Sequence, residues 1–197
     1  MAYTDKQPNS FTIFDGDLDE NAAKKLTKSN AIAVDTEAMG LIHGRDRLCL
    51  IQLCDVEDNV VCIKIDMNHK FSPRLKLLLE NPAIEKVFHF ARFDIAALAS
   101  NLNIDVNSIF CTKIASKIAR TYSPRHGLKE VIGELVGVEL DKQAQSSDWG
   151  RVNELTEQQL TYAANDVRYL LEAKSKLESM LKREDRWDLA KKCFECI

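Results

Sequence analysis

The stretch AIAVDTEAMGL, residues 31–41, decides the fold of this chain. Its first half is an apolar run that predicts a buried strand in the middle of a sheet. Asp35 and Glu37 follow this run directly, and side chains two positions apart on a strand share a face. The stretch therefore predicts a central strand that presents two carboxylates in the same direction.

Two more segments offer polar groups on defined faces. LTYAANDVRYLL, residues 160–171, has a helical pattern in which Tyr162 and Asp166 share a face because they are four positions apart. Asp94 ends a third apolar stretch, KVFHFARFD, residues 86–94. Acids on three separated elements are the oxygen ligands that a hard divalent cation needs. The predicted metal ligands are Asp35, Glu37, Asp94 and Asp166.

The ligand types indicate the chemistry. Oxygen-only ligands suit Mg²⁺ or Mn²⁺, whereas zinc usually recruits histidine or cysteine. Four carboxylates can hold two such ions about 4 Å apart, where they clamp the attacking and leaving oxygens of a phosphoryl transfer. Tyr162 lies one helical turn before Asp166, so its hydroxyl is placed to orient the attacking water. A core aromatic whose hydroxyl only reaches the rim is the other interpretation of Tyr162.

These residues also resemble a known family. D-T-E at 35–37, F-D at 93–94 and Y-x-x-x-D at 162–166 are similar to the three motifs of the DEDDy 3′–5′ exonucleases, and of ribonuclease D in particular. The similarity extends from about residue 11 to residue 180. It implies a ribonuclease H-like exonuclease fold, two divalent cations and stepwise release of 5′-mononucleotides from RNA 3′ ends.

The resemblance also assigns substrate contacts. Leu41 matches the apolar position that wedges against the terminal bases. The family often has asparagine four residues before the middle aspartate, where this chain has Phe90. We therefore expect stacking on Phe90 in place of a hydrogen bond to the substrate. Two competing functions use the same fold: a DNA exonuclease of the proofreading or Werner type, and a non-catalytic nucleic-acid-binding module. The intact set of mutually repelling acids argues against the module.

A basic segment interrupts a chain whose net charge is −3. Between residues 110 and 130 there is a single acid, Glu130, against five basic residues: Lys113, Lys117, Arg120, Arg125 and Lys129. Such a stripe beside an acidic site predicts binding of a single-stranded phosphate backbone, although a solvated helix face would look the same. His126, beside Arg125, and His89, near the end of a predicted strand, are both candidate phosphate contacts, although each could instead simply cap a helix or pack. Trp149 is either a lid residue or a hydrophobic plug.

The rest of the chain predicts an α/β domain with a mixed central sheet flanked by helices. Expected strands lie at 11–14, 31–35, 47–54, 59–65 and 86–90, and expected helices at 17–29, 72–81, 92–101, 112–120, 128–136 and 156–183. We expect a single exonuclease domain over residues 1–197, without the HRDC domains that follow it in longer ribonuclease D proteins. With neither a signal peptide nor a membrane span in the sequence, we expect a cytoplasmic protein with no membrane partner.

Cysteine usage agrees with a reducing compartment. Cys49, Cys54 and Cys62 lie in apolar strand-like runs, where a free thiol packs as a small hydrophobe. Cys193 and Cys196 form a lone C-x-x-C, which favours a helix face over a zinc site because no second ligand pair is near.

Overall fold

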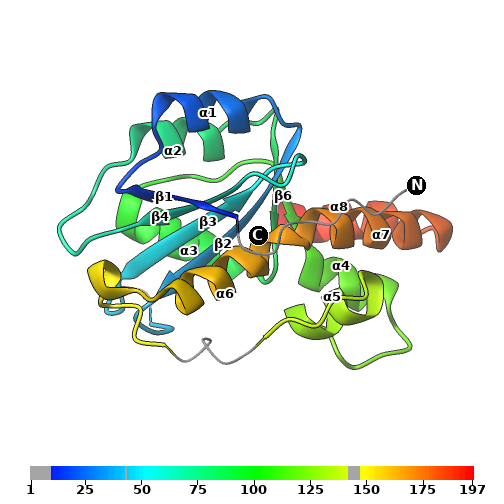
Figure 1. Ribbon diagram of the computed structural model, residues 1–197. Helices are drawn as coiled ribbons and strands as arrows, with labels where there is room; N and C mark the ends of the chain where they lie inside the picture. The colour runs from blue at the N-terminus through cyan, green and yellow to red at the C-terminus, as the bar shows by residue number, and fades with distance from the viewer. Residues whose placement is uncertain (1–9, 43, 142–146) are drawn as a thin grey trace.

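The computed structural model describes residues 10–42, 44–141 and 147–197. Its centre is a mixed six-stranded sheet with the strand order β1-β4-β3-β2-β5-β6 (Figure 1). The strands are β1 (Thr12–Asp15), β2 (Ala31–Ala38), β3 (Leu48–Cys54), β4 (Val60–Lys64), β5 (Glu85–Phe88) and β6 (Ile109–Cys111). The sheet and its flanking helices confirm the predicted α/β class.

Helices surround this sheet. They are α1 (Glu20–Thr27), α2 (Pro73–Leu79), α3 (Ala91–Leu102), α4 (Thr112–Ala119), α5 (Leu128–Leu135), α6 (Glu157–Arg168), α7 (Leu170–Arg183) and α8 (Trp187–Glu195). In Figure 1, α1 and α2 lie together above the strands and α6 lies below them, while α4, α5, α7 and α8 gather at one end. None of the described helices is long and apolar enough to cross a membrane.

Strand β2 is central, as its sequence predicts. It pairs antiparallel with β3 and parallel with β5. Ile32, Ala33 and Val34 are fully buried because helices cover both faces of the strand. The register then shifts between Glu37 and Ala38, where the pairing with β3 becomes irregular. The second half of β2, which carries Asp35 and Glu37, is therefore less buried than the first half, and its polar side chains are accessible.

The prediction of a single long helix over residues 156–183 is wrong, because the structure has two helices there, α6 and α7, which are separated at Tyr169. Arg168, fully buried at the end of α6, donates hydrogen bonds of 2.8 Å to Asp58 Oδ2 and 2.8 Å to the carbonyl oxygen of Ser10. These partners lie far away in sequence, so a local pattern could not show them. The break allows α6 to follow the sheet while α7 turns toward α4 and α5.

Two elements at the far edge were not anticipated. Strand β6 has only three residues and pairs with β5 alone, so its sequence pattern is too short to recognise. Helix α8 covers this edge, with the rings of Phe110 and Phe194 4.8 Å apart. Cys193 lies on α8 and Cys196 caps its end, which agrees with the predicted helix face. All six cysteines are free thiols.

Candidate active site

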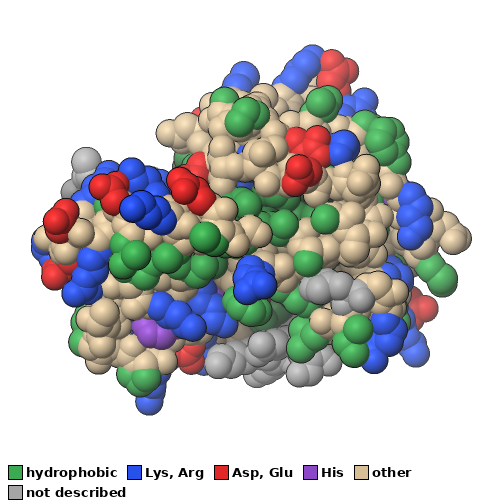
Figure 2. All heavy atoms as spheres, turned by 180° about the vertical axis from the view of Figure 1, so that it is seen from behind, with side chains coloured by type: hydrophobic (Ala, Val, Ile, Leu, Met, Phe, Trp, Pro, Cys, Tyr) green, Lys and Arg blue, Asp and Glu red, His purple; other side chains and the backbone are tan. Residues whose placement is uncertain are grey.

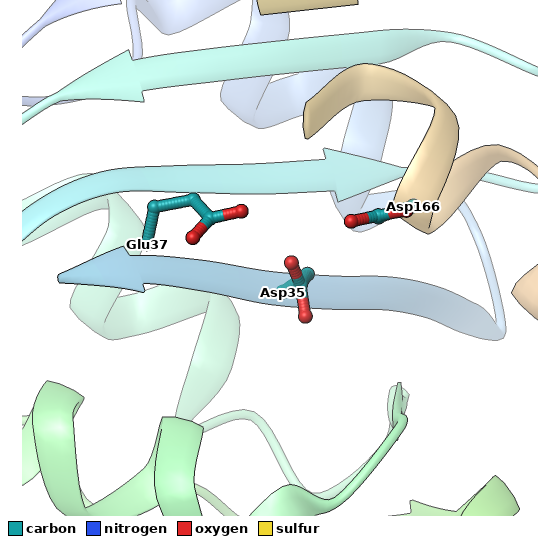
Figure 3. Close-up of side chains that lie close together, drawn as sticks. All are labelled: Asp35, Glu37 and Asp166. Carbon is teal, nitrogen blue, oxygen red and sulfur yellow. The ribbon is translucent and has the colours of Figure 1, made fainter. Parts of the chain in front are cut away.

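Three of the predicted acids meet at the end of β2. Asp35 and Glu37 come from β2 and Asp166 from α6, and one carboxylate oxygen of each lies within 4.8 Å of the others. Figure 3 shows the three side chains converging on one space between the strand and the helix. The shared face expected for Asp35 and Glu37 from the strand spacing is therefore confirmed.

Helix α6 is held close enough to the sheet to deliver Asp166. A capping box between Thr156 and Gln159 fixes where the helix begins, with Gln159 N donating to Thr156 Oγ1 at 3.2 Å and Thr156 N donating to Gln159 Oε1 at 2.9 Å. Ala163 and Ala164 are fully buried in the face that packs on β2, β3 and β4. Their small side chains let the helix approach the strands, which brings the following turn over Asp35.

Asp94 is placed by a different contact. Its carboxylate is buried on α3, and Oδ1 accepts a 2.8 Å hydrogen bond from Thr36 Oγ1. Thr36 lies between the two β2 acids, so its side chain points to the opposite face of the strand. Asp94 is not among the three acids whose oxygens lie within 4.8 Å of one another, although its carboxylate interacts electrostatically with both Asp35 and Glu37.

Burial makes these acids weak. It raises the pKa of Asp35 to about 7. Burial, followed by the charges of the three other carboxylates, raises the pKa of Glu37 to about 10. The pKa values of Asp94 and Asp166 also lie well above the ordinary value, because of burial and then the charge of Asp35. Without a nearby positive charge the group therefore retains protons at neutral pH.

Tyr162 stands beside Asp166, as its spacing predicts. Burial, the charge of Asp166 and a hydrogen bond with the Asp166 carboxylate raise the pKa of the Tyr162 phenol. The phenol therefore stays protonated and acts as a hydrogen-bond donor, not as a base. The Trp149 ring packs against it, with centroids 6.3 Å apart and planes at 35°. Only 3% of Trp149 is exposed, so of its two interpretations the structure supports the plug.

Two apolar side chains are exposed near the acids in sequence. Leu41 is 79% exposed beyond the end of β2, and Phe90 is 50% exposed at the start of α3. Phe90 also adopts a left-handed backbone conformation, with φ at 73°. Exposed hydrophobic residues of this size are available to contact nucleobases.

The basic segment is only partly exposed. Lys117 and Arg125 face solvent, but Arg120 is fully buried. Its guanidinium forms an ion pair with Glu134 and donates to Ser116 Oγ at 2.9 Å and to the Arg125 carbonyl at 2.7 Å. The prediction that Arg120 joins an exposed stripe is therefore wrong, because its donors are used inside the fold. Figure 2 shows lysine and arginine side chains beside a histidine at the α4–α5 end of the molecule.

Both candidate histidines are tied to hydroxyl groups. Nδ1 of His126 lies 2.9 Å from Ser116 Oγ, and Nδ1 of His89 lies 2.9 Å from Thr112 Oγ1. Burial, and then the charge of Lys113, lower the pKa of His89 to about 4. His89 is therefore neutral at physiological pH, and its hydrogen bond ties the end of β5 to the start of α4. His126 is half-buried beside the exposed Arg125.

Sequence reasoning missed two contacts at the site, Thr36 with Asp94 and Trp149 with Tyr162. Thr36 is visible inside D-T-E, yet its contact with Asp94 depends on how α3 packs on the sheet. Trp149 was noticed, but nothing local indicated that it packs against Tyr162. Both contacts depend on the tertiary structure, because the two partners of each contact come from separate elements.

Comparison with known proteins agrees with this geometry. Ribonuclease D of Sphingobium indicum is 32% identical over 164 residues, which cover 83% of this chain and 42% of that protein. DNA polymerase I of Aquifex aeolicus is 34% identical over 166 residues, covering 84% of this chain and 27% of that protein. The chain thus spans at most about two fifths of the length of these two relatives.

A solved structure matches over more of its length. Brucella melitensis NrnC is 42% identical with a TM-score of 0.90, and the match covers 94% of this chain and 88% of that one. The same protein has been solved with bound Mg²⁺ and bound to pGG. The family model for a 3′-5′ exonuclease matches residues 11–182, a range that contains every acid of the site. The chain therefore belongs to the 3′–5′ exonuclease family.

Proposed function

We propose that this chain is a metal-dependent 3′–5′ exoribonuclease that releases 5′-mononucleotides from RNA 3′ ends. The observation that carries the proposal is the convergence of Asp35, Glu37 and Asp166 within 4.8 Å, with Tyr162 beside them. The names of its ribonuclease D relatives support RNA as the substrate.

The acids fit divalent cations. Their donors are all carboxylate oxygens, and their raised pKa values show that the group lacks compensating positive charge. Asp35, Glu37, Asp94 and Asp166 would hold two ions, Mg²⁺ or Mn²⁺, and the Mg²⁺-bound NrnC structure supports the first. When bound, such ions supply Lewis-acid stabilisation of the charge that develops on phosphorus oxygens.

Tyr162 orients the nucleophile. Its hydroxyl donates its one proton to the Asp166 carboxylate, and the phenol oxygen accepts a hydrogen bond from the attacking water and directs it at the terminal phosphorus. A bond forms from the water oxygen to phosphorus while the bond from phosphorus to the 3′ oxygen of the preceding nucleotide breaks. The water loses one proton to solvent and the leaving 3′ oxygen gains one. The products are a 5′-mononucleotide and a strand with a new 3′-hydroxyl.

The surrounding side chains would hold a single strand. Leu41 wedges against the terminal bases, Phe90 offers an exposed ring, and Lys117, Arg125 and His126 face the phosphate backbone. Arg120 contributes by holding the Arg125 carbonyl and not by touching the substrate. The pGG complex of NrnC supports a site that accepts short strands.

The test is digestion of 5′-labelled RNA with Mg²⁺ and with Mn²⁺. A ladder that shortens by one nucleotide, with 5′-monophosphate products, is expected. RNA with a 3′-phosphate should resist, since it adds negative charge beside Asp35 and Glu37, and circular RNA should resist because it has no end. Cuts inside a circle would contradict the exonuclease proposal.

A second candidate is a DNA 3′–5′ exonuclease, favoured by the 34% identity with DNA polymerase I. The 2′-hydroxyl is what allows a protein to distinguish RNA from DNA. Sequence-matched single-stranded DNA and RNA should therefore be digested in parallel, and a faster rate on DNA would favour the second candidate.

A further inference from the structure

Phe90 has an unusual combination of properties. It lies two residues after the end of β5 and caps the start of α3, one helical turn before Asp94. Its φ of 73° lies in the left-handed region, which asparagine and glycine tolerate but a bulky side chain occupies only with strain. Half of this large apolar residue is also exposed. Both properties disfavour phenylalanine for stability, which points to a role for its ring outside the core.

The ring already has one partner. Lys113 Nζ lies 4.2 Å from its centroid, so the ammonium group sits over one face of the ring. Lys113 makes no salt bridge within the described part of the chain, and it is half-buried at the first turn of α4. The ammonium is therefore available to an anion that approaches beside the ring.

A hydrogen-bond network fixes the two residues side by side. Thr112 Oγ1 donates to the Phe88 carbonyl at 3.0 Å and lies 2.9 Å from His89 Nδ1. Thr112 comes directly before Lys113, and His89 and Phe88 are the two residues before Phe90. The junction of β5 with α3 is therefore locked to the start of α4, and the pair is preorganised before any ligand arrives.

We propose that Phe90 and Lys113 form a nucleotide subsite for one of the last three nucleotides of the substrate strand. The open part of the ring stacks on a base, and the ammonium binds the adjacent phosphate. Because the ring lies one turn from Asp94, the stacked base belongs to the 3′ end and not to a distant part of the strand. This inference rests on the proposed function and adds to it the residues that bind the 3′ end of the strand.

Abasic scanning provides the test. Fluorescent seven-nucleotide RNAs, each with one abasic position, are bound to Asp166→Asn protein and to the same protein carrying Phe90→Asn. One abasic position among the last three should weaken binding about tenfold, and Phe90→Asn should remove that penalty. The subsite proposal would be overturned if the effect of Phe90→Asn did not depend on any abasic position, or depended only on positions farther from the 3′ end. Phe71→Asn, which removes another exposed phenylalanine, is the matched control.

Stability separates this role from a structural one. Phe90→Asn should leave the melting temperature unchanged or raise it, since asparagine suits the left-handed conformation, while KM for RNA rises about tenfold. A fall in melting temperature that accounts for the lost binding would overturn the proposal. Lys113→Met should reduce the salt dependence of RNA binding by about one unit of slope, whereas Lys192→Met on α8 should not.

The same experiments distinguish failure of the subsite proposal from failure of the proposed function. If the parent protein digests RNA but Phe90 shows no coupling, only the subsite is wrong. If the parent neither digests nor binds RNA, both proposals are wrong.

Discussion

Thr36 Oγ1 donates a 2.8 Å hydrogen bond to Asp94 Oδ1 in the interior of the protein. The strand that presents Asp35 and Glu37 thus also orients a third carboxylate, through the hydroxyl of the residue between them. The acids come from separate elements, but their relative positions depend on one strand. Small changes in β2 should therefore affect the whole group.

Thr36→Val tests this dependence. Valine keeps the shape of threonine and removes only the hydroxyl donor, so Asp94 loses that hydrogen bond and keeps the one from the Thr36 backbone. We expect the Mg²⁺ concentration for half-maximal activity to rise about ten- to a hundredfold, as for other partners of metal ligands. A Mg²⁺ titration of RNA digestion measures this, and Thr36→Ser, which retains the hydroxyl, should behave like the parent.

Asp166→Asn should abolish turnover by at least about a thousandfold, because it removes a predicted ligand and the partner of Tyr162. RNA binding should remain or improve, since one negative charge near the phosphates is lost. Digestion rates and fluorescence anisotropy report the two effects. Glu195→Gln, an exposed acid on α8, is the control. Activity within tenfold of the parent would rule out the assigned role of Asp166.

The metal-free protein should become less stable as the pH rises. Burial raises the pKa of Asp35 from its ordinary value of 3.8 to about 7, so the fold favours the protonated acid. Its contribution to stability is therefore present at low pH and is lost as the pH rises through about 7. Melting curves in EDTA between pH 5 and about pH 8 should show this decline. Saturating Mg²⁺ should reduce it, and Asp35→Asn should make it shallower without metal but not remove it, because the pKa values of Glu37, Asp94 and Asp166 are also raised.

Tyr162→Phe should be milder than loss of a ligand. The helix and the carboxylates remain, and only the hydroxyl that orients the water is removed. We expect kcat to fall about ten- to a thousandfold with little change in KM. Tyr122→Phe removes an exposed hydroxyl that donates to Glu134 and should leave kcat unchanged. A large KM effect at normal kcat would instead make Tyr162 a substrate-binding residue.

The exposed and buried cations should respond differently to neutralisation. Replacing Lys117 and Arg125 together by glutamine should weaken single-stranded RNA binding and flatten its salt dependence by up to about two units of slope. Arg120→Gln should instead lower the melting temperature, because Glu134 loses its buried partner. Equal effects of the two changes on the salt slope would contradict this division.

The site was predictable where the decisive signal was local. The two-residue period of a strand predicts that Asp35 and Glu37 lie together, and the helical period predicts the same of Tyr162 and Asp166. The structure confirms both pairs. Arg120 was misplaced because a count of charges does not reveal that a helix end turns one arginine inward. The division of the last helices was missed for a similar reason, since it depends on a side chain that reaches across the fold.

The position of α6 in the chain has a consequence for synthesis. The strands that it contacts are all complete before residue 65, yet Asp166 and Tyr162 reach the ribosome exit much later. A nascent chain that lacks α6 has only part of the acidic group and leaves one face of β2, β3 and β4 without this cover. A nascent chain that still lacks α6 therefore lacks Asp166 and Tyr162, and we expect it not to cleave RNA.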